Sequence, residues 1–277
     1  MRRLKLTIAR TPFLGYAILL VFRANLAIGY FKKPILNLLR WLLKSKETTN
    51  FTFDLEDRNK RHLASLIADV ANIEFDVVTQ YLEEVEQDEI LKKHISDATA
   101  KSDWQFIADK EARFGRRVGW YAFVRALKPR VVVETGVDKG LGACVLASAL
   151  KRNKEEGYEG KYYGTDIKPK AGYLLSGDYA GFGTILYGDS IESLKELDCM
   201  IDLFINDSDH SADYEAMEYE VVANKLSEHA IILGDNADFT DALLNFSLKM
   251  SRHFVFFKEK PFEHWHPGAG IGISFNR

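Results

Sequence analysis

The stretch Arg130–Gly142 (RVVVETGVDKGLG) constrains the fold more than any other part of the chain. Its three consecutive valines lead into the acid Glu134 and then into a loop that contains Gly136 and Gly140. An uninterrupted apolar run of this kind is typical of a parallel strand that is buried on both faces, and the residues after Gly142 have the composition of a helix. The pattern therefore predicts an α/β domain whose first strand, glycine-containing loop and helix form a ligand-binding unit.

The loop favours one class of cofactor over another. A dinucleotide-binding loop reads G-x-G-x-x-G and has its acid at the end of the following strand. Here Asp138 stands at the middle glycine position, and Glu134 already ends the first strand. A nicotinamide-dependent oxidoreductase is therefore the less favoured alternative. The pattern E-x-G-x-x-x-G resembles the first motif of class I S-adenosylmethionine-dependent methyltransferases, which implies that Glu134, Gly136 and Gly140 bind S-adenosylmethionine.

The next two predicted strands end in polar residues. Residues 161–166 (KYYGTD) form a strand that ends in Asp166, and residues 184–188 form a third strand that precedes Asp189 and Ser190. A carboxylate accepts two hydrogen bonds at once, which suits a pair of ribose hydroxyls. In the methyltransferases that the chain resembles, these positions bind the ribose and line the adenine pocket. The resemblance thus adds all three residues to the cofactor site, with a helix cap as the alternative role for Asp166.

The fourth and fifth predicted strands, residues 201–205 and 230–233, are both followed by oxygen ligands. Parallel strands deliver such residues to one edge of a sheet, and carboxylate and amide oxygens suit Mg²⁺, Mn²⁺ or Ca²⁺. Metal-dependent O-methyltransferases of the catechol type place an aspartate after the fourth strand and an Asp-Asn pair after the fifth. Asp207, Asp235 and Asn236 are similar to that set, so the resemblance implies a divalent metal, with Mg²⁺ as the first choice.

The residues after the fourth strand also include two candidate bases. The form D-x-D-H, from Asp207 to His210, resembles bacterial sugar and macrolide O-methyltransferases. His210 stands where the catechol enzymes carry a lysine, and an ordinary histidine pKa of about 6.5 suits proton acceptance near neutral pH. Asp209 is the rival base. We expect one of them to take the proton from an acceptor with neighbouring hydroxyls, either a small molecule or a glycan.

Two apolar runs, residues 253–258 and 270–275, predict successive C-terminal strands. They fit the reversed last strand of the methyltransferase sheet, and the resemblance covers roughly Arg113 to Phe275, within a domain predicted at residues 113–277. The fold class is therefore predicted to be a Rossmann-like class I methyltransferase sheet, mostly parallel, with an N-terminal helical extension. The loop between the two strands contains His264, Trp265 and His266, for which we expect an aromatic lid over the substrate, with a histidine metal pair as the alternative.

Residues 1–46 contain ten basic side chains and no acid. Ile35, Leu38, Leu39 and Leu42 share one helical face, which is typical of a helix that lies in a membrane interface. The apolar run of residues 12–22 is shorter than the roughly 20 residues that span a bilayer. We expect peripheral contact with the inner face of the cell membrane, and packing on the fold or an oligomer interface is the alternative. A non-catalytic, membrane-tethered protein is the third functional alternative.

Residues 47–112 are richer in acids and show helical spacing of apolar residues, so they are predicted to form a helical cap before the domain at residues 113–277. The net charge of -3 and the pI near 6.2 give no reason to expect nucleic acid as a partner. Only two cysteines occur, Cys144 and Cys199, which argues against a disulfide framework. Together these features predict a cytoplasmic protein.

Overall fold

The computed structural model describes residues 12–48 and 52–276. The chain divides into two compact units, which are described separately below. The larger unit comprises Lys46–Phe262 and Pro267–Arg277, and the smaller one comprises Met1–Ser45 and Glu263–His266.

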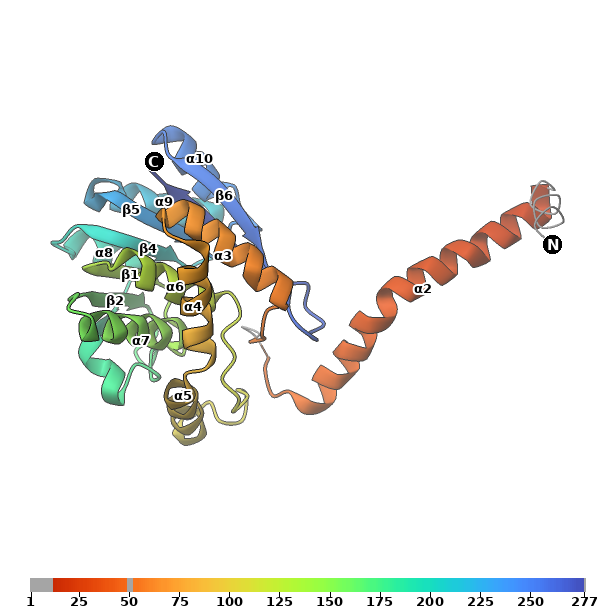
Figure 1. Ribbon diagram of the computed structural model, residues 1–277, viewed down its shortest axis with the longest axis horizontal. Coiled ribbons are helices and arrows are strands. Elements are labelled where there is room, and N and C mark those ends of the chain that lie inside the picture. The colour runs from red at the N-terminus through yellow and green to blue at the C-terminus, as the bar shows by residue number, and fades with distance from the viewer. Residues whose placement is uncertain (1–11, 49–51, 277) are drawn as a thin grey trace. The chain divides into compact units, whose positions relative to one another are not determined.

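A seven-stranded sheet forms the centre of the larger unit (Figure 1). Its spatial order is β3-β2-β1-β4-β5-β7-β6, in which the first five strands along the chain run parallel and β7 runs antiparallel to both of its neighbours. This order with its reversed strand confirms the predicted fold class. The strands are β1 (Val131–Thr135), β2 (Lys161–Asp166), β3 (Gly183–Tyr187), β4 (Ile201–Asn206), β5 (Leu226–Gly234), β6 (His253–Lys258) and β7 (Gly270–Phe275).

Helices cover the sheet on both sides, because successive side chains of a strand point to opposite faces. Val132 packs with helices α3 to α7, whereas Val133 packs with α8, α9 and α10. Leu203 and Phe204 in β4 divide between the two sides in the same way. The helices are α3 (Asp57–Ala71), α4 (Phe75–Glu86), α5 (Glu89–Lys101), α6 (Arg117–Leu127), α7 (Leu141–Glu155), α8 (Ser190–Glu196), α9 (Ala212–Val222) and α10 (Ala242–Lys249). Two short 3-10 helices are η1 (Gly177–Phe182) and η2 (Ala223–Lys225).

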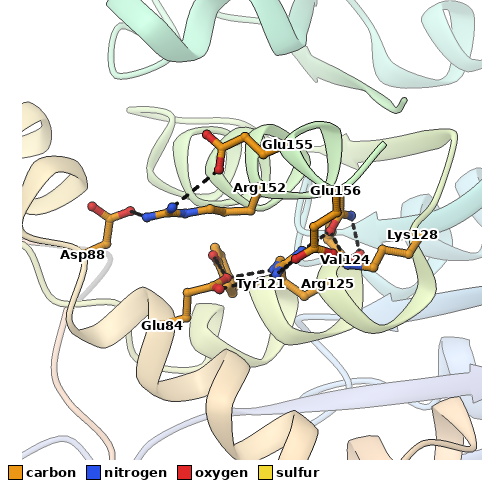
Figure 2. A network of polar contacts seen from close by, with 10 residues as sticks. Glu84, Asp88, Tyr121, Val124, Arg125, Lys128, Arg152, Glu155 and Glu156 are labelled. Atoms are coloured by element: carbon orange, nitrogen blue, oxygen red, sulfur yellow. Dashed lines mark hydrogen bonds and ion pairs between the residues drawn. The ribbon is translucent and has the colours of Figure 1, made fainter. Parts of the chain in front are cut away.

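A buried arginine links helices α4, α6 and α7, which pack in the same hydrophobic core as the sheet (Figure 2). The Arg125 side chain in α6 is 3% exposed, and its guanidinium donates to Glu84 of α4 at 2.8 Å. The same group donates to Asn153 in the last turn of α7 and to Glu156 just after that helix, at 2.5 Å each. Tyr121 donates a further hydrogen bond to Glu84. Helices α4, α6 and α7 are therefore held together by one polar network.

The smaller unit contains α2 (Pro12–Lys44), one helix of 33 residues that continues through Pro34 (Figure 1). Apolar side chains are exposed along its length, and the segment Phe13–Lys44 is long and apolar enough to cross a membrane. The helix therefore continues beyond the apolar run of residues 12–22 and includes Arg23. The basic residues before Pro12, which belong to the predicted membrane-contacting segment, lie outside the described part of the chain.

The last turns of α2 contact the loop between β6 and β7 within the smaller unit. The rings of Trp41 and Trp265 lie 5.3 Å apart between centroids. Arg40 forms an ion pair with Glu263 at 3.2 Å. The Trp265 ring also stacks on His264, so the aromatic residues of the loop form a cluster with this helix end. Their predicted roles as a lid or as a metal pair stay predictions.

Candidate active site

The loop between β1 and α7 is packed tightly against its neighbours. Gly136 has a φ of +81°, and a Cβ atom there would overlap the backbone carbonyl oxygen of Asp207. Gly140 has a φ of +91°, and its Cβ atom would lie 2.8 Å from the Cα atom of Gly172. Only glycine combines this backbone conformation with such close approach. The fold itself therefore requires glycine at both positions, in addition to any role in binding a cofactor.

Asp166 at the end of β2 fixes the conformation of this loop. Its carboxylate accepts the backbone N–H of Asp138 at 2.8 Å and that of Lys168 at 2.7 Å. Asp138 itself has a φ of +47°. The structure therefore places Asp166 beside the glycine-containing loop and gives it a structural task there. Its predicted contact with the ribose stays a prediction.

Glu134 lies beneath the loop. It is 1% exposed and accepts a hydrogen bond from the Tyr162 hydroxyl at 2.6 Å. A Cβ atom on Gly142 of α7 would overlap the Glu134 carboxylate, so the helix covers it directly. Burial raises the pKa of Glu134 to about 7. Its predicted contact with a ligand stays a prediction, because the residues that line the adjacent cleft do not include it.

A cleft opens at the carboxyl ends of β1 and β4, within the larger unit. It contains about 650 Å³ of empty space, open solvent included. Gly136, Asp138 and Leu141 line it from the β1–α7 loop, and Arg117 and Asp207 line it from the side of α6 and β4. The further lining residues include Ile95, Thr99, Tyr173 and Leu174. The cleft therefore brings a predicted cofactor residue, Gly136, together with a predicted metal ligand, Asp207.

The residues after β3 make contacts with α9. Asp189 is the N-cap of α8, accepting the backbone N–H of Glu192 at 3.1 Å, and it also accepts the Tyr214 hydroxyl at 2.9 Å. Ser190 donates to Glu218, and its hydroxyl lies 3.0 Å from that of Tyr214. The helix cap is thus Asp189 rather than Ser190. Neither residue lines the cleft described above, so their predicted place at the adenine stays a prediction.

Glu218 in α9 joins several strand ends and was not expected from the sequence. The residue is fully buried and accepts side-chain hydrogen bonds from Thr135, Asn206 and Ser208, the last at 2.7 Å. Burial raises its pKa, although these donors favour the charged form. A carboxylate between the ends of β1 and β4 holds the edge of the sheet in one arrangement. Its only sequence signal is an acid on the apolar side of a predicted helix.

The predicted metal ligands are surrounded by two arginines. Both carboxylate oxygens of Asp235 accept hydrogen bonds from the guanidinium of Arg116, whose third nitrogen donates to Glu259 at 3.0 Å. The guanidinium of Arg117 lies 3.8 Å from Asp207. Burial and the neighbouring Asp235 raise the pKa of Asp207 well above its ordinary value. Burial opposes the charge of Asp235 too, but Arg116 more than offsets this, and its pKa lies below the ordinary value.

These residues provide a poor fit to a divalent ion. Arg116 already occupies both oxygens of Asp235, which a metal would need. Among the described residues, no group of three or more His, Cys, Asp or Glu side chains is placed to hold a metal. Asn236 is the one observation in favour of a ligand, because neither polar atom of its buried amide has a hydrogen-bond partner among the described residues. The metal at Asp207, Asp235 and Asn236 stays a prediction.

The two predicted bases lie in the loop between β4 and α9. His210 and Asp209 are both exposed. Asp209 accepts the backbone N–H of Ser211 at 2.8 Å, just before α9 begins. Neither side chain lines the cleft, whereas Asp207, two residues earlier than Asp209, does. The choice between the two bases therefore stays open.

Residues 133–237 match the family model of a methyltransferase domain, Methyltransf_24. No curated protein matches the chain in sequence. Among solved structures, the chain is similar to the methyltransferase PaMTH1 of Podospora anserina bound to S-adenosylhomocysteine, with 16% identity and a TM-score of 0.49 over 73% of this chain and 94% of that one. It is also similar to the O-methyltransferase TomG of Streptomyces achromogenes in complex with S-adenosylmethionine, with 16% identity and a TM-score of 0.49 over 69% of this chain and 90% of that one.

The matched segment begins in β1 and ends just after β5. It includes the glycine-containing loop, Asp166 and the polar residues that follow β4 and β5. The reversed β7 completes the sheet outside this segment in the order that the class I fold predicts. Residues 133–237 therefore match a methyltransferase domain, which agrees with the predicted methyltransferase.

Proposed function

We propose that the chain transfers a methyl group to a hydroxyl of a small molecule or glycan, as an S-adenosylmethionine-dependent O-methyltransferase. One observation carries this proposal: Gly136 of the β1–α7 loop and Asp207 after β4 line the same cleft and touch through their backbones. The first belongs to the expected cofactor side and the second to the expected acceptor side. A cleft that adjoins both sides can hold donor and acceptor in contact, which is the main source of rate for such a transfer.

We assign the cofactor to Gly136, Gly140 and Asp166, with Asp189 and Ser190 at the adenine end. The cofactor supplies a methyl group on a positively charged sulfur. When bound, it would supply this methyl group to the acceptor oxygen, and the acceptor hydroxyl would pass its proton to a base of the protein. His210 or Asp209 takes this proton in our proposal, because both follow Asp207 in the loop after β4. Acceptors with neighbouring hydroxyls remain the favoured class.

The direct test is a methyl-transfer assay with isotopically labelled S-adenosylmethionine. Full-length protein is incubated with catechol, sugar and lipid-linked sugar acceptors, and labelled products are identified by mass spectrometry. The proposal expects an O-methyl ether from at least one hydroxyl acceptor. Transfer to nitrogen or carbon, with no transfer to oxygen, would contradict it while leaving the methyltransferase class intact.

We also infer that α2 contacts the inner face of the cell membrane. Its apolar side chains are exposed, including Leu20 at 53% and Phe22 at 62%. Lys32, Lys33 and Lys44 add positive charge at the C-terminal half, and cations near an anionic surface contribute about 1 kcal/mol each. Trp41, which contacts Trp265, is of the kind enriched at membrane interfaces. An acceptor at or near the membrane follows from this inference.

Vesicle flotation tests the membrane inference. Full-length protein should float with vesicles that contain anionic lipid and less with neutral vesicles. The triple variant Lys32→Gln, Lys33→Gln and Lys44→Gln should float less and should be released at lower salt. Release of the parent protein by high salt would support interfacial contact, whereas retention would support a spanning helix. Failure to float with either vesicle would contradict membrane contact and favour an interface with protein.

A further inference from the structure

Five buried charged residues stand together near the acceptor side of the cleft: Arg116, Arg117, Asp207, Asp235 and Glu259. Their side chains are between 0% and 14% exposed. Arg116 comes from the start of α6, while the acids come from the residues after β4, β5 and β6. Buried charges at such a site are tolerated only when they are paired. The arrangement of the pairs therefore shows which cation each acid requires.

Arg116 is held in one orientation by two acids. Two of its nitrogens donate to the two oxygens of Asp235, and the third donates to Glu259 at 3.0 Å. Glu259 in turn accepts the backbone N–H of Ala269 at 3.3 Å. This two-point pairing of a planar guanidinium with a carboxylate is the strongest and most directional form of the interaction. Asp235 is consequently paired with a protein cation at the position where the sequence predicts an ion.

The charge balance leads to the same conclusion. Two guanidinium groups face three carboxyl groups, so the cluster has at most one net negative charge. A divalent cation would replace it with net positive charge, at a place where Arg116 and Arg117 would both repel the ion. The cluster is close to neutral with its own two arginines.

We propose that Arg116 takes the place of the divalent cation predicted from the sequence, so that the enzyme works without a metal. The proposal deepens the function proposed above and rests on it. Arg116 is a positioning residue. Its guanidinium neutralises Asp235 and bridges it to Glu259, and so holds the ends of β5 and β6 in place beside the cleft. Arg117, 3.8 Å from Asp207, is then the cation that lines the cleft itself.

The first experiment measures metal binding without reference to activity. Full-length protein is titrated with Mn²⁺ alone and followed by electron paramagnetic resonance, beside the variant Arg116→Gln. The parent protein should bind no Mn²⁺ at micromolar to low millimolar concentration. The variant exposes both oxygens of Asp235 next to Asp207 and Asn236, so gain of one Mn²⁺ site there would support the proposal directly. One Mn²⁺ site in the parent protein that is lost in Asp235→Asn would overturn it.

The second experiment uses methyl transfer with an acceptor from the panel above. Transfer by the parent protein should be unchanged in excess chelator and after addition of Mg²⁺. Arg116→Gln should lower kcat by about 100-fold, as expected for removal of one fixed electrostatic group. Arg116→Lys should recover part of kcat, and the affinity for S-adenosylmethionine should remain within a few-fold of the parent. The matched control is Arg152→Gln, since Arg152 is 43% exposed, pairs with Asp88 and Glu155, and does not line the cleft.

The outcomes are distinguishable. Loss of transfer in chelator with recovery by Mg²⁺ would overturn the metal-free proposal and leave the O-methyltransferase assignment in place. Absence of transfer to every hydroxyl acceptor would count against the proposed function, and the Mn²⁺ titration would still decide the role of Arg116. If Arg116→Gln fails to fold, Mn²⁺ binding and methyl transfer are compared between Arg116→Lys and the parent protein instead.

Discussion

Gly136 and Asp207 touch through their backbones, so closely that a Cβ atom on Gly136 would overlap the carbonyl oxygen of Asp207. This contact is possible because β1 lies next to β4 in the sheet, with Thr135 paired to Asn206. The loop expected to bind the cofactor and the segment expected to face the acceptor are thus parts of one rigid edge. A change in either one affects the other.

Gly136→Ala is therefore expected to destabilise the fold as well as to weaken cofactor binding. The overlap with Asp207 and the φ of +81° together should cost about 2–4 kcal/mol of the free energy of unfolding. Gly157→Ala is the matched control, because Gly157 has a φ of +91° but open space around its Cβ position, and it should cost only about 1 kcal/mol. Urea unfolding measures both. Equal losses in the two variants would show that the contact with Asp207 is not tight.

Glu134 gives the fold a specific dependence on pH. Its pKa is about 7 in the folded protein and about 4.5 in an unfolded chain, so the folded state holds the proton more tightly. The resulting stabilisation is complete below pH 4.5 and is lost as the pH rises toward and through 7. In Glu134→Gln, the amide can still accept from Tyr162 but does not titrate. The parent should therefore lose stability relative to this variant between pH 5 and pH 8.

Denaturant unfolding at the two pH values measures this difference. Comparison with the variant removes the contribution of the other buried acids. Glu155→Gln serves as a control, because Glu155 is 54% exposed. If parent and Glu134→Gln show the same change between pH 5 and pH 8, Glu134 does not carry a raised pKa.

Arg125 is predicted to hold the helices before the sheet onto the domain (Figure 2). Arg125→Met leaves Glu84 and Asn153 without their buried cationic donor and should lower the free energy of unfolding by about 2–4 kcal/mol. Lys154→Met is the control, since Lys154 is 55% exposed and its ion pair with Glu159, which is 75% exposed, is at the surface, where such a pair contributes less than about 1 kcal/mol. Thermal unfolding compares them. A loss below 1 kcal/mol in Arg125→Met would show that apolar packing alone holds these helices.

Most of the fold could be predicted from the sequence, because its signals are local. The apolar runs and the polar residues that end them fixed β1, β2 and β4 to within a residue or two. β5 begins four residues earlier than predicted, at Leu226, because Ser227, Glu228 and His229 are polar and at least partly exposed and therefore interrupt the apolar signal. The helix α2 is longer than predicted, because the charged Arg23 ends the apolar run of residues 12–22 on which the prediction rests.

The site was less predictable, because its contacts depend on tertiary structure. Arg116 and Asp235 are 119 residues apart, and nothing local in either segment indicates that they pair. Glu134 is a different case. Side chains in β1 alternate between the two faces, so Glu134 shares the face of Val132, which is covered by the helices from α3 to α7. That alternation was present in the sequence and would have placed Glu134 beneath α7 rather than in the cleft.

The central claim is that the β1–α7 loop and Asp166 hold S-adenosylmethionine. Calorimetric titration of the full-length protein tests it, with S-adenosylmethionine, S-adenosylhomocysteine and NAD as ligands. Both methionine-derived ligands should bind, and NAD should not. Asp166→Ala should weaken their binding at least about tenfold, because it removes a carboxylate that accepts two backbone N–H groups of the site. The exposed Asp178→Ala should bind as the parent does. Absence of binding by S-adenosylmethionine, or binding of NAD that depends on Asp166, would contradict the account.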